Sequence, residues 1–477
     1  MYSKLYACVK RGEYTSDYFK CTKGTKQGCH ISPAAFQIYV NDLPKIFSME
    51  KCEPLSVGDM KIGCLLYADD VLILSQGCKG LQESLNNLNR YCQTWRLNVS
   101  IRKTKVMVFN SRKNKYVFKL GNKILQNADQ VSYLGFILTP SGSFKATLKY
   151  LYTKANRALF SLRSSLGSLP SIPVKTYIRL FDTMIKPILM YGSEVWGAYM
   201  FEPNTSAYYI VTMLKDVNIL MEKLHSKICK QILMVNRKAS NYAVRYELGR
   251  YPFIVDIICS VFKYYVNIVN RNGESLAKVA ASLHKSQQLQ WFNFIQYIAA
   301  VTGCNVNDLN IRSILKGNSS VYNKLKVLSE KVIFKQVSKS NKLQVLTSVK
   351  TVYGIEPYLY NLQNPSDRKA VTKYRISAHK LPVESGRYLN IDRQERYCKF
   401  CHVYVGDENH CLLRCFHPAL TMLRKTFLND IYRINPQVKS LPRDCLFVYL
   451  LSFKDKSIMH NTAKYISDIL ELHEMEN

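Results

Sequence analysis

Two aspartates, Asp69 and Asp70, stand side by side between two apolar runs of strand length within residues 61–75. The runs are rich in Leu, Ile and Val, which predicts two strands buried in a sheet, with the acids at the tight turn that joins them. Like charges repel, so neighbouring buried carboxylates need a compensating charge. Hard oxygen ligands suit Mg²⁺, which supports phosphoryl transfer. The alternative is an exposed hairpin turn, because aspartate is common in turns.

A second group of metal-ligand residues lies towards the C-terminus. Cys398 and Cys401 are spaced as Cys-x₂-Cys, and His410 and Cys415 follow. Three thiolates and one imidazole at this spacing are typical of a closed tetrahedral zinc site of structural type. The alternative is a set of ordinary reduced cysteines. Substitute or additional ligands nearby are His402, Cys411, His417 and, further upstream, His379.

A basic loop with two glycines precedes a predicted helix near the N-terminus. Gly24 and Gly28 allow the backbone to approach a ligand closely. Ser32 has the character of an N-cap and Pro33 that of a first helical residue. A plain loop–helix junction is the alternative for this stretch taken alone.

Composition indicates a polyanionic partner. Lys and Arg outnumber Asp and Glu by 67 to 34 in 477 residues, a formal charge of +33 spread along the chain. An excess of this size favours nucleic acid over a merely basic soluble protein. The length predicts two to four domains.

Cysteine usage and hydropathy set the expected compartment. The 15 cysteines are an odd number in a chain that is not small, which argues against a disulfide framework. No apolar run reaches membrane-spanning length, since the best candidate, residues 253–269, contains Asp256 and Lys263. With no signal peptide recognised, we expect an intracellular protein of the nucleus, the cytoplasm or both, without a membrane partner.

Taken together, the loop and the hairpin resemble motifs B and C of reverse transcriptases from non-LTR (LINE-type) retrotransposons. Motif B is matched by Gly24, Gln27, Gly28, Ser32 and Pro33. Motif C is matched by Tyr67, Ala68, Asp69 and Asp70. The resemblance implies an RNA-directed DNA polymerase that transfers nucleotides by a two-metal mechanism.

The resemblance continues downstream to about residue 140. Residues 97–105, which include Lys103, look like motif D, and Tyr133, Leu134 and Gly135 within a predicted strand over 131–138 look like motif E, the primer grip. The cysteine–histidine group also resembles the Cys-Cys-His-Cys segment that follows the polymerase in LINE-type proteins.

The resemblance assigns roles to these residues. Asp69 and Asp70 would bind Mg²⁺, and Lys103 would assist the pyrophosphate leaving group. Tyr67 and Ala68 would lie near the primer end, with the motif E residues as the primer grip. Gly24, Gln27 and Gly28 would meet the template or the incoming base pair. The implied partners are an RNA template, a DNA primer and dNTPs, and the implied cofactors are Mg²⁺ at the polymerase site and structural Zn²⁺.

The predicted fold class is α+β. A partial polymerase palm, an antiparallel sheet with covering helices, is followed by a mostly helical thumb and extension and a small zinc-binding module. The predicted divisions are a palm with motifs B to E (1–140), a thumb-like helical region containing a helix over 145–166 (141–205), a helical extension (206–370), a zinc-knuckle-like CCHC module (371–420) and C-terminal helices (421–477).

Motif A, which supplies another metal-binding aspartate in this family, is not found upstream of Gly24. Residues 1–20 contain Glu13 and Asp17, but no apolar strand leads into either acid, and no first element is predicted there. The fingers are not recognised either. We therefore expect impaired polymerase activity from this chain, as from a reverse transcriptase truncated at its N-terminus. The alternatives are a non-catalytic nucleic-acid-binding remnant of a retrotransposon protein and a decayed copy without selected function.

Overall fold

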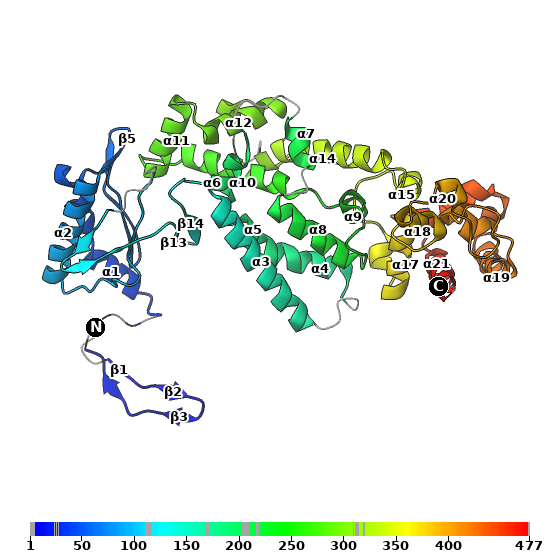
Figure 1. Ribbon diagram of the computed structural model, residues 1–477, viewed down its shortest axis with the longest axis horizontal. Coiled ribbons are helices and arrows are strands. Elements are labelled where there is room, and N and C mark those ends of the chain that lie inside the picture. The colour runs from blue at the N-terminus through cyan, green and yellow to red at the C-terminus, as the bar shows by residue number, and fades with distance from the viewer. Residues whose placement is uncertain are drawn as a thin grey trace. The chain divides into compact units, whose positions relative to one another are not determined.

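The computed structural model divides the chain into two compact units (Figure 1). Unit 1 comprises residues 1–143 and 272–283, and unit 2 comprises residues 144–271 and 284–477. Strands occur in unit 1 and helices dominate unit 2, so the predicted mixed class is confirmed. The structure describes residues 5–22, 24, 26, 28–109, 116–166, 172–202, 209–215, 219–308, 310, 314–317 and 320–475.

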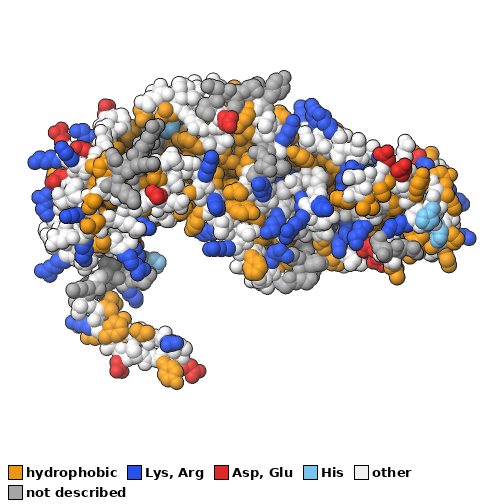
Figure 2. Space-filling model, in the orientation of Figure 1, with side chains coloured by type: hydrophobic (Ala, Val, Ile, Leu, Met, Phe, Trp, Pro, Cys, Tyr) orange, Lys and Arg blue, Asp and Glu red, His pale blue; other side chains and the backbone are white. Residues whose placement is uncertain are grey.

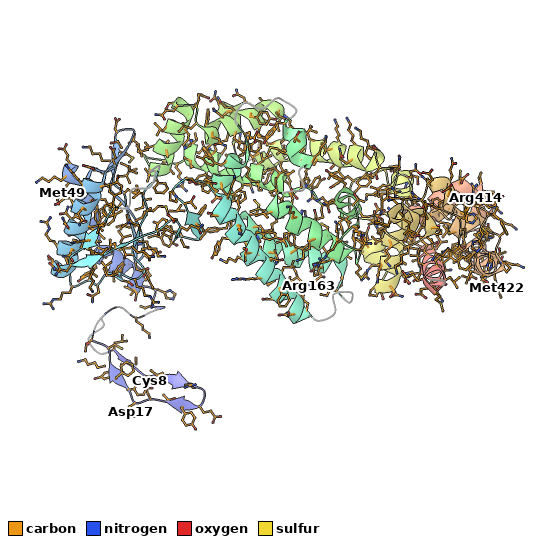
Figure 3. The ribbon with its side chains drawn as sticks, viewed as in Figure 1. Cys8, Asp17, Met49, Arg163, Arg414 and Met422 are labelled. Carbon is orange, nitrogen blue, oxygen red and sulfur yellow. The ribbon has the colours of Figure 1, made fainter. Side chains whose placement is uncertain are left out.

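Unit 1 begins with a β-hairpin that the sequence did not predict. Strand β1 (Tyr6–Ala7) pairs antiparallel with β4 (Phe19–Lys20), and β2 (Lys10–Arg11) pairs with β3 (Tyr14–Thr15). Figure 3 labels Cys8 and Asp17 in this hairpin. Its strands are largely exposed and lack the apolar alternation that marks a half-buried strand, which is why the pattern gave no signal.

The core of unit 1 forms where a helix covers a set of short strand pairs. Helix α2 (Cys78–Thr94) places an apolar stripe, including Leu85 and Leu88, against Phe47 and Phe118, as its amphipathic pattern predicts. The elements around it are α1 (Ser32–Tyr39), β5 (Leu55–Val57) with β6 (Met60–Ile62), β7 (Cys64–Tyr67) with β8 (Asp70–Ile73), β10 (Lys119–Leu120) with β11 (Lys123–Ile124), and β13 (Val131–Tyr133) with β14 (Phe136–Leu138).

The sheet differs from the predicted one. Among the described residues each strand pairs with a single partner, so unit 1 contains two-stranded pairs instead of one continuous antiparallel sheet. One pair, β9 (Lys105–Val106) with β12 (Gln126–Asn127), is parallel. Pairing across the strands is long-range information that local apolar patterns do not carry.

Gly63 lets the β7–β8 hairpin lie directly on the preceding 3₁₀ turn, Leu43–Phe47. A Cβ at this position would lie 2.2 Å from the carbonyl oxygen of Phe47. Because the clash is with backbone, we expect Gly63→Ala to lower the free energy of unfolding by about 1–3 kcal/mol. Equilibrium urea unfolding measures the change. The control is Gly354→Ala, where an added Cβ meets no atom within 4 Å, and equal stabilities for the two variants would refute the packing argument.

Unit 2 starts with helix α3 (Lys145–Leu166), at the bounds predicted from its apolar stripe. Leu151, Ala155 and Leu159 are buried along that stripe. The helices that follow are α4 (Val174–Leu180), α5 (Lys186–Met190), α6 (Ser193–Trp196), α7 (Tyr209–Lys215), α8 (Leu220–Ile232), α9 (Asn241–Leu248), α10 (Phe253–Val269), α12 (Gln290–Val301), α14 (Val321–Ser338), α15 (Gln344–Val349), α16 (Tyr358–Asn361), α17 (Pro365–Arg375), α18 (Pro382–Tyr388), α19 (Pro418–Ile434), α20 (Arg443–Ser452) and α21 (Met459–Met475), with α11 (Leu276–Ser286) crossing the boundary with unit 1.

One hydrophobic core runs through much of unit 2, from Val174 to Leu470. It includes side chains of the cysteine–histidine segment as well as those of α17, α19 and α21. The boundary predicted at residue 420 therefore falls inside a shared core. Across the described residues, no single helix is long and apolar enough to cross a membrane. Helices α9 and α10, which are bent by 67° relative to each other, reach that length and apolar composition only when they are counted together.

Candidate metal centres

The Asp69–Asp70 pair lies at the tip of the β7–β8 hairpin, as predicted. Tyr67 and Asp70 face each other across the ladder, so Ala68 and Asp69 form a two-residue turn. Ala68 has φ of 52°, in the left-handed region that disfavours residues other than glycine. Such strain, of order 1 kcal/mol or more, is typically retained at functional sites.

The structure agrees with the alternative of an exposed hairpin turn, and the two strands are only partly buried where burial in a sheet was predicted. Both aspartates are exposed, and so are Tyr67 and the two residues next to the tip, Leu66 and Val71. The hairpin has only two strands, and its tip extends past the part that packs on the core. Water therefore screens the repulsion between the Asp69 and Asp70 carboxylates. Within the described part of the chain, neither carboxylate forms an ion pair with Lys, Arg or His, which leaves their oxygens accessible to a cation.

Tyr133, of the predicted motif E, lies close enough to Asp70 for the two groups to interact electrostatically. Burial raises the pKa of the Tyr133 hydroxyl, and the charge of Asp70 raises that pKa further. The predicted continuous strand over 131–138 is instead a hairpin. Leu134 and Gly135 form its turn with φ of 47° and 81°, the positive values that a type I′ turn needs at both central positions.

The glycine loop is tied to helix α1 by a side chain. Ser32 is the first residue of α1 and not its N-cap, which is Ile31. The Ser32 hydroxyl donates a hydrogen bond of 2.7 Å to the carbonyl oxygen of Lys26. Gly24 and Gly28 have φ of 82° and 81°, which explains the requirement for glycine at both positions. Gln27 lies outside the described residues.

Lys103 lies in an exposed turn that precedes β9. Its backbone N–H donates a hydrogen bond of 3.0 Å to the carbonyl oxygen of Ser100, which fixes the turn. Its side chain is exposed to solvent.

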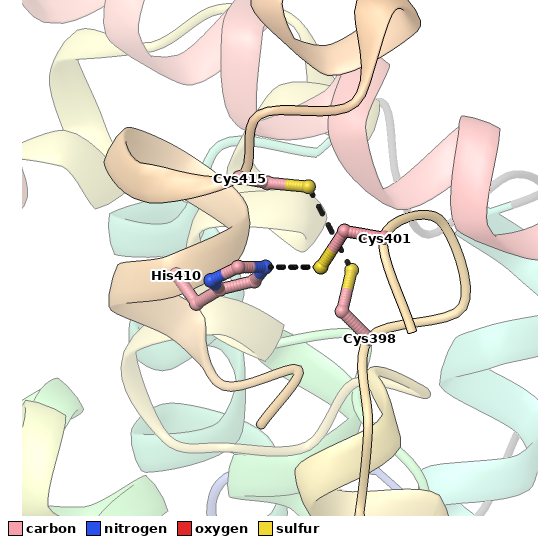
Figure 4. A group of neighbouring side chains, drawn as sticks. All are labelled: Cys398, Cys401, His410 and Cys415. Carbon is pink, nitrogen blue, oxygen red and sulfur yellow. Dashed lines mark hydrogen bonds between the residues drawn. The ribbon is translucent and has the colours of Figure 1, made fainter. Parts of the chain in front are cut away.

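The four predicted zinc ligands converge on one point (Figure 4). Their ligand atoms all lie within 4.8 Å of one another. Cys398 Sγ is 3.9 Å from Cys415 Sγ, and Cys401 Sγ is 3.3 Å from His410 Nε2. A tetrahedral zinc with Zn–S bonds of about 2.3 Å places two sulfurs about 3.8 Å apart, so the arrangement fits that ion. Soft thiolates also favour zinc over Mg²⁺.

Backbone geometry around the cluster supports a metal-bound thiolate. The N–H groups of Phe400 and Cys401 donate to the sulfur of Cys398, and the N–H of His417 donates to that of Cys415. These donors stabilise negative charge on sulfur, although burial outweighs the donor at Cys415 and raises the pKa of that thiol to about 12. The pKa of the Cys398 thiol is lowered to about 2, chiefly by a hydrogen bond from Cys411.

The alternative ligands have other roles. Cys411 is a fully buried partner of Cys398. The Nδ1 of His417 accepts a hydrogen bond from the N–H of Ala419 at the start of α19. His379 is held by Glu408, with Nε2 2.9 Å from Oε1, and His402 has φ of 52° in the turn after the second cysteine.

The cysteine–histidine segment is anchored in unit 2 by hydrogen bonds to its backbone. Tyr374 donates to the carbonyl oxygen of Glu408, and Tyr465 donates to that of Leu412, each at 2.6 Å. Both hydroxyls are buried. The segment therefore does not depend on its own few apolar residues, because α17 and α21 supply the surrounding core.

Sequence reasoning found no role for the stretch Tyr246–Pro252, and the structure provides one. Arg375, fully buried, contacts the carboxylates of Glu247 and Glu356 at 2.5 and 2.6 Å. Lys350 pairs with Glu356 on the other side. Gly249 has φ of 60°, and a Cβ there would lie 2.6 Å from the backbone of Gly354. The feature in the sequence that could have indicated this role is Glu247 followed by Gly249, shortly before Pro252.

Comparisons with known proteins match the N-terminal region. Residues 2–138 match the family model for reverse transcriptase (RNA-dependent DNA polymerase). A protein of Drosophila melanogaster named "Probable RNA-directed DNA polymerase from transposon BS" is 26% identical over 183 residues, 36% of this chain and 20% of that protein. The "Retrovirus-related Pol polyprotein from type-1 retrotransposable element R2" of Nasonia vitripennis is 27% identical over 142 residues, 28% of this chain and 14% of that protein.

These matches confirm the predicted resemblance to reverse transcriptases of non-LTR retrotransposons. The aligned region spans a fifth or less of the length of either relative.

Proposed function

We propose that unit 1 contributes to RNA-directed DNA polymerisation, with Asp69 and Asp70 as Mg²⁺ ligands. The observation that carries the proposal is the strained tip of the β7–β8 hairpin, which presents two adjacent carboxylates without cationic partners among the described residues. Carboxylate oxygens are the ligands that Mg²⁺ prefers, and a metal so placed would neutralise charge on the transferring phosphate.

The remaining residues of unit 1 take supporting roles in this proposal. Tyr133 and the Leu134–Gly135 turn would position the primer end, consistent with the proximity of Tyr133 to Asp70. Gly24 and Gly28 would let the backbone approach the template or incoming base pair, and Lys103 would meet the leaving pyrophosphate. Unit 1 would then correspond to a palm.

The Asp69→Asn variant tests the proposal. With a DNA primer annealed to an RNA template, dNTPs and Mg²⁺, we expect the parent chain to extend the primer weakly, because motif A is not recognised in it. The variant should do so at least about 100-fold more slowly, because the metal loses an anionic ligand. Asp59→Asn, an exposed aspartate in the turn between β5 and β6, is the matched control. Primer extension that persists in Asp69→Asn would contradict the proposal.

A second candidate function is nucleic-acid binding without catalysis. The +33 charge favours it, as does the exposed basic face of α3, where Arg163 lies near the C-terminal end (Figure 3). Figure 2 shows Lys and Arg side chains over the visible face of the chain. Helix α3 would act as a thumb that follows the phosphate backbone.

Salt dependence tests the nucleic-acid partner that both functions share. We expect the dissociation constant for an RNA–DNA hybrid to rise steeply between about 50 and 200 mM salt, because each neutralised phosphate releases counterions. Fluorescence anisotropy of a labelled hybrid measures it. A dissociation constant that does not change with salt would count against nucleic acid. Tight, salt-dependent binding without primer extension would favour the non-catalytic function.

A further inference from the structure

A basic cleft of about 570 Å³ lies in unit 2. Four segments line it: the turn after α8, the turn before α15, the end of α17 with the turn that follows, and α18. Five of the ten lining residues are Lys or Arg and none is acidic. The residues that carry the argument are Arg237, Lys238, Lys342, Lys373, Lys380 and Tyr388.

The positive charge of the basic cleft is only partly neutralised. Lys342 pairs with the buried Glu384 at 2.8 Å. Glu474 is shared between Lys373 and Lys380 at the long distances of 3.8 and 3.9 Å. Burial lowers the pKa of Lys373, which Glu474 offsets in part. No other ion pair reaches these five cations from the described residues, so about three positive charges remain for an external anion.

Two exposed cations of the cleft, Arg237 and Lys238, belong to a turn that is held in place before any ligand arrives. The Nζ of Lys230 donates a hydrogen bond of 2.8 Å to the carbonyl oxygen of Arg237, which fixes the turn after α8. The Nζ of Lys238 lies 4.6 Å from the centre of the Tyr388 ring. Tyr388 is 54% exposed although it lines a cleft. An aromatic ring and cations in one cleft form the pairing that binds unstacked bases and their phosphates.

We propose that the basic cleft binds single-stranded nucleic acid, with phosphates on Arg237 and Lys238 and a base against Tyr388. The volume falls within the range of about 300–1,000 Å³ typical of ligand sites, which accommodates nucleotide units but not a duplex. A base must be unpaired to stack on a side chain, so a duplex cannot make this contact. All of its lining residues belong to unit 2, whereas the proposed polymerase hairpin belongs to unit 1. Oligonucleotide binding therefore measures occupancy of the cleft without a primer-extension assay.

The test compares two double variants of the full chain. Arg237→Gln with Lys238→Gln removes two cations from the cleft, and Lys331→Gln with Lys335→Gln removes two exposed cations from α14, outside it. The probes are a fluorescein-labelled 20-nucleotide oligo(U) and an RNA–DNA hybrid of the same length. We expect the cleft variant to bind oligo(U) about tenfold more weakly than the α14 variant does. Its salt slope should fall by about 1.4, since each phosphate contact on a single strand contributes about 0.7.

Two further arms identify the ligand. Tyr388→Leu should weaken oligo(U) binding about fivefold or more while leaving hybrid binding unchanged, since stacking on one aromatic contributes a factor of that order. Unlabelled oligo(U) should displace the probe at far lower phosphate concentration than uridine monophosphate. Equal oligo(U) affinity in the cleft and α14 variants would overturn the proposal. Equal losses on oligo(U) and hybrid, or equal competition by the mononucleotide, would overturn it as well. Thermal unfolding midpoints matching that of the parent confirm that the variants are folded.

Discussion

Cys401→Ser is expected to release the metal from the cysteine–histidine cluster and to destabilise unit 2 by several kcal/mol. Structural zinc contributes about 10–16 kcal/mol of apparent binding free energy in small zinc modules, and that energy stabilises the fold. The cluster lies among buried residues of the unit 2 core, since Cys398 and Cys415 are fully buried. Loss of the ion should therefore expose residues 390–420 to protease and loosen α17 and α21 as well, while unit 1 stays folded.

Elemental analysis of protein purified under reducing conditions without chelator measures the zinc content. We expect one zinc per parent chain and its loss in Cys401→Ser. Cys445→Ser is the matched control, because Cys445 is an exposed cysteine outside the cluster. Parent protein without zinc would refute the site. His410→Ala should lose the metal too, and full retention by that variant would show that another residue is the fourth ligand.

Arg375→Met is expected to lower the free energy of unfolding by about 3–5 kcal/mol, the usual cost of leaving a buried charge without its partner. Burial by itself lowers the pKa of the Arg375 guanidinium, but Glu247 and Glu356 outweigh that effect and the net pKa is raised. Removal of Arg375 leaves the Glu247 carboxylate inside the core without a cation, with the hydroxyl of Tyr358 donating to it from 3.1 Å. Methionine preserves most of the volume, so the loss reports charge and not a cavity.

Equilibrium urea unfolding is measured for Arg375→Met, for Glu247→Gln and for the double variant. The comparison separates the effect of the lost guanidinium from that of the unpaired Glu247 carboxylate. Neutralising Glu247 should restore part of the loss, because the two sites are coupled. Arg433→Met, which removes an exposed arginine paired with Asp430, should change stability by less than about 0.5 kcal/mol. An equal effect of Arg375→Met and Arg433→Met would contradict a structural role for the buried cluster.

Several features could be predicted because they depend on residues close together in the sequence. Helix α3 was predicted at its observed bounds from an apolar stripe of helical period. The four ligand candidates were predicted from cysteine spacing, and the structure brings their ligand atoms within 4.8 Å. The turn of the β7–β8 hairpin was predicted from two apolar runs that flank the acids. Each of these signals is complete within about twenty residues.

Other features depended on contacts that no local pattern carries. The sequence left open whether Asp69 and Asp70 are buried or lie in an exposed turn, because exposure depends on what covers the hairpin and not on its own apolar runs. Tyr133–Gly135 was predicted inside a strand and forms the end of a strand and a turn, since positive φ at Leu134 is not apparent from its residue type.

By itself, the sequence determined the resemblance to reverse transcriptases, the positive charge and the identity of the metal-ligand candidates, because motif order, composition and spacing are properties of the chain. The tertiary structure alone decided that Arg375 neutralises Glu247, 128 residues away, and that lysines and arginines from four segments share one cleft. Burial and the pairing of charges depend on contacts between segments that are far apart in the chain. Those contacts decide whether the free-energy cost of removing an ion from water is offset by a partner charge.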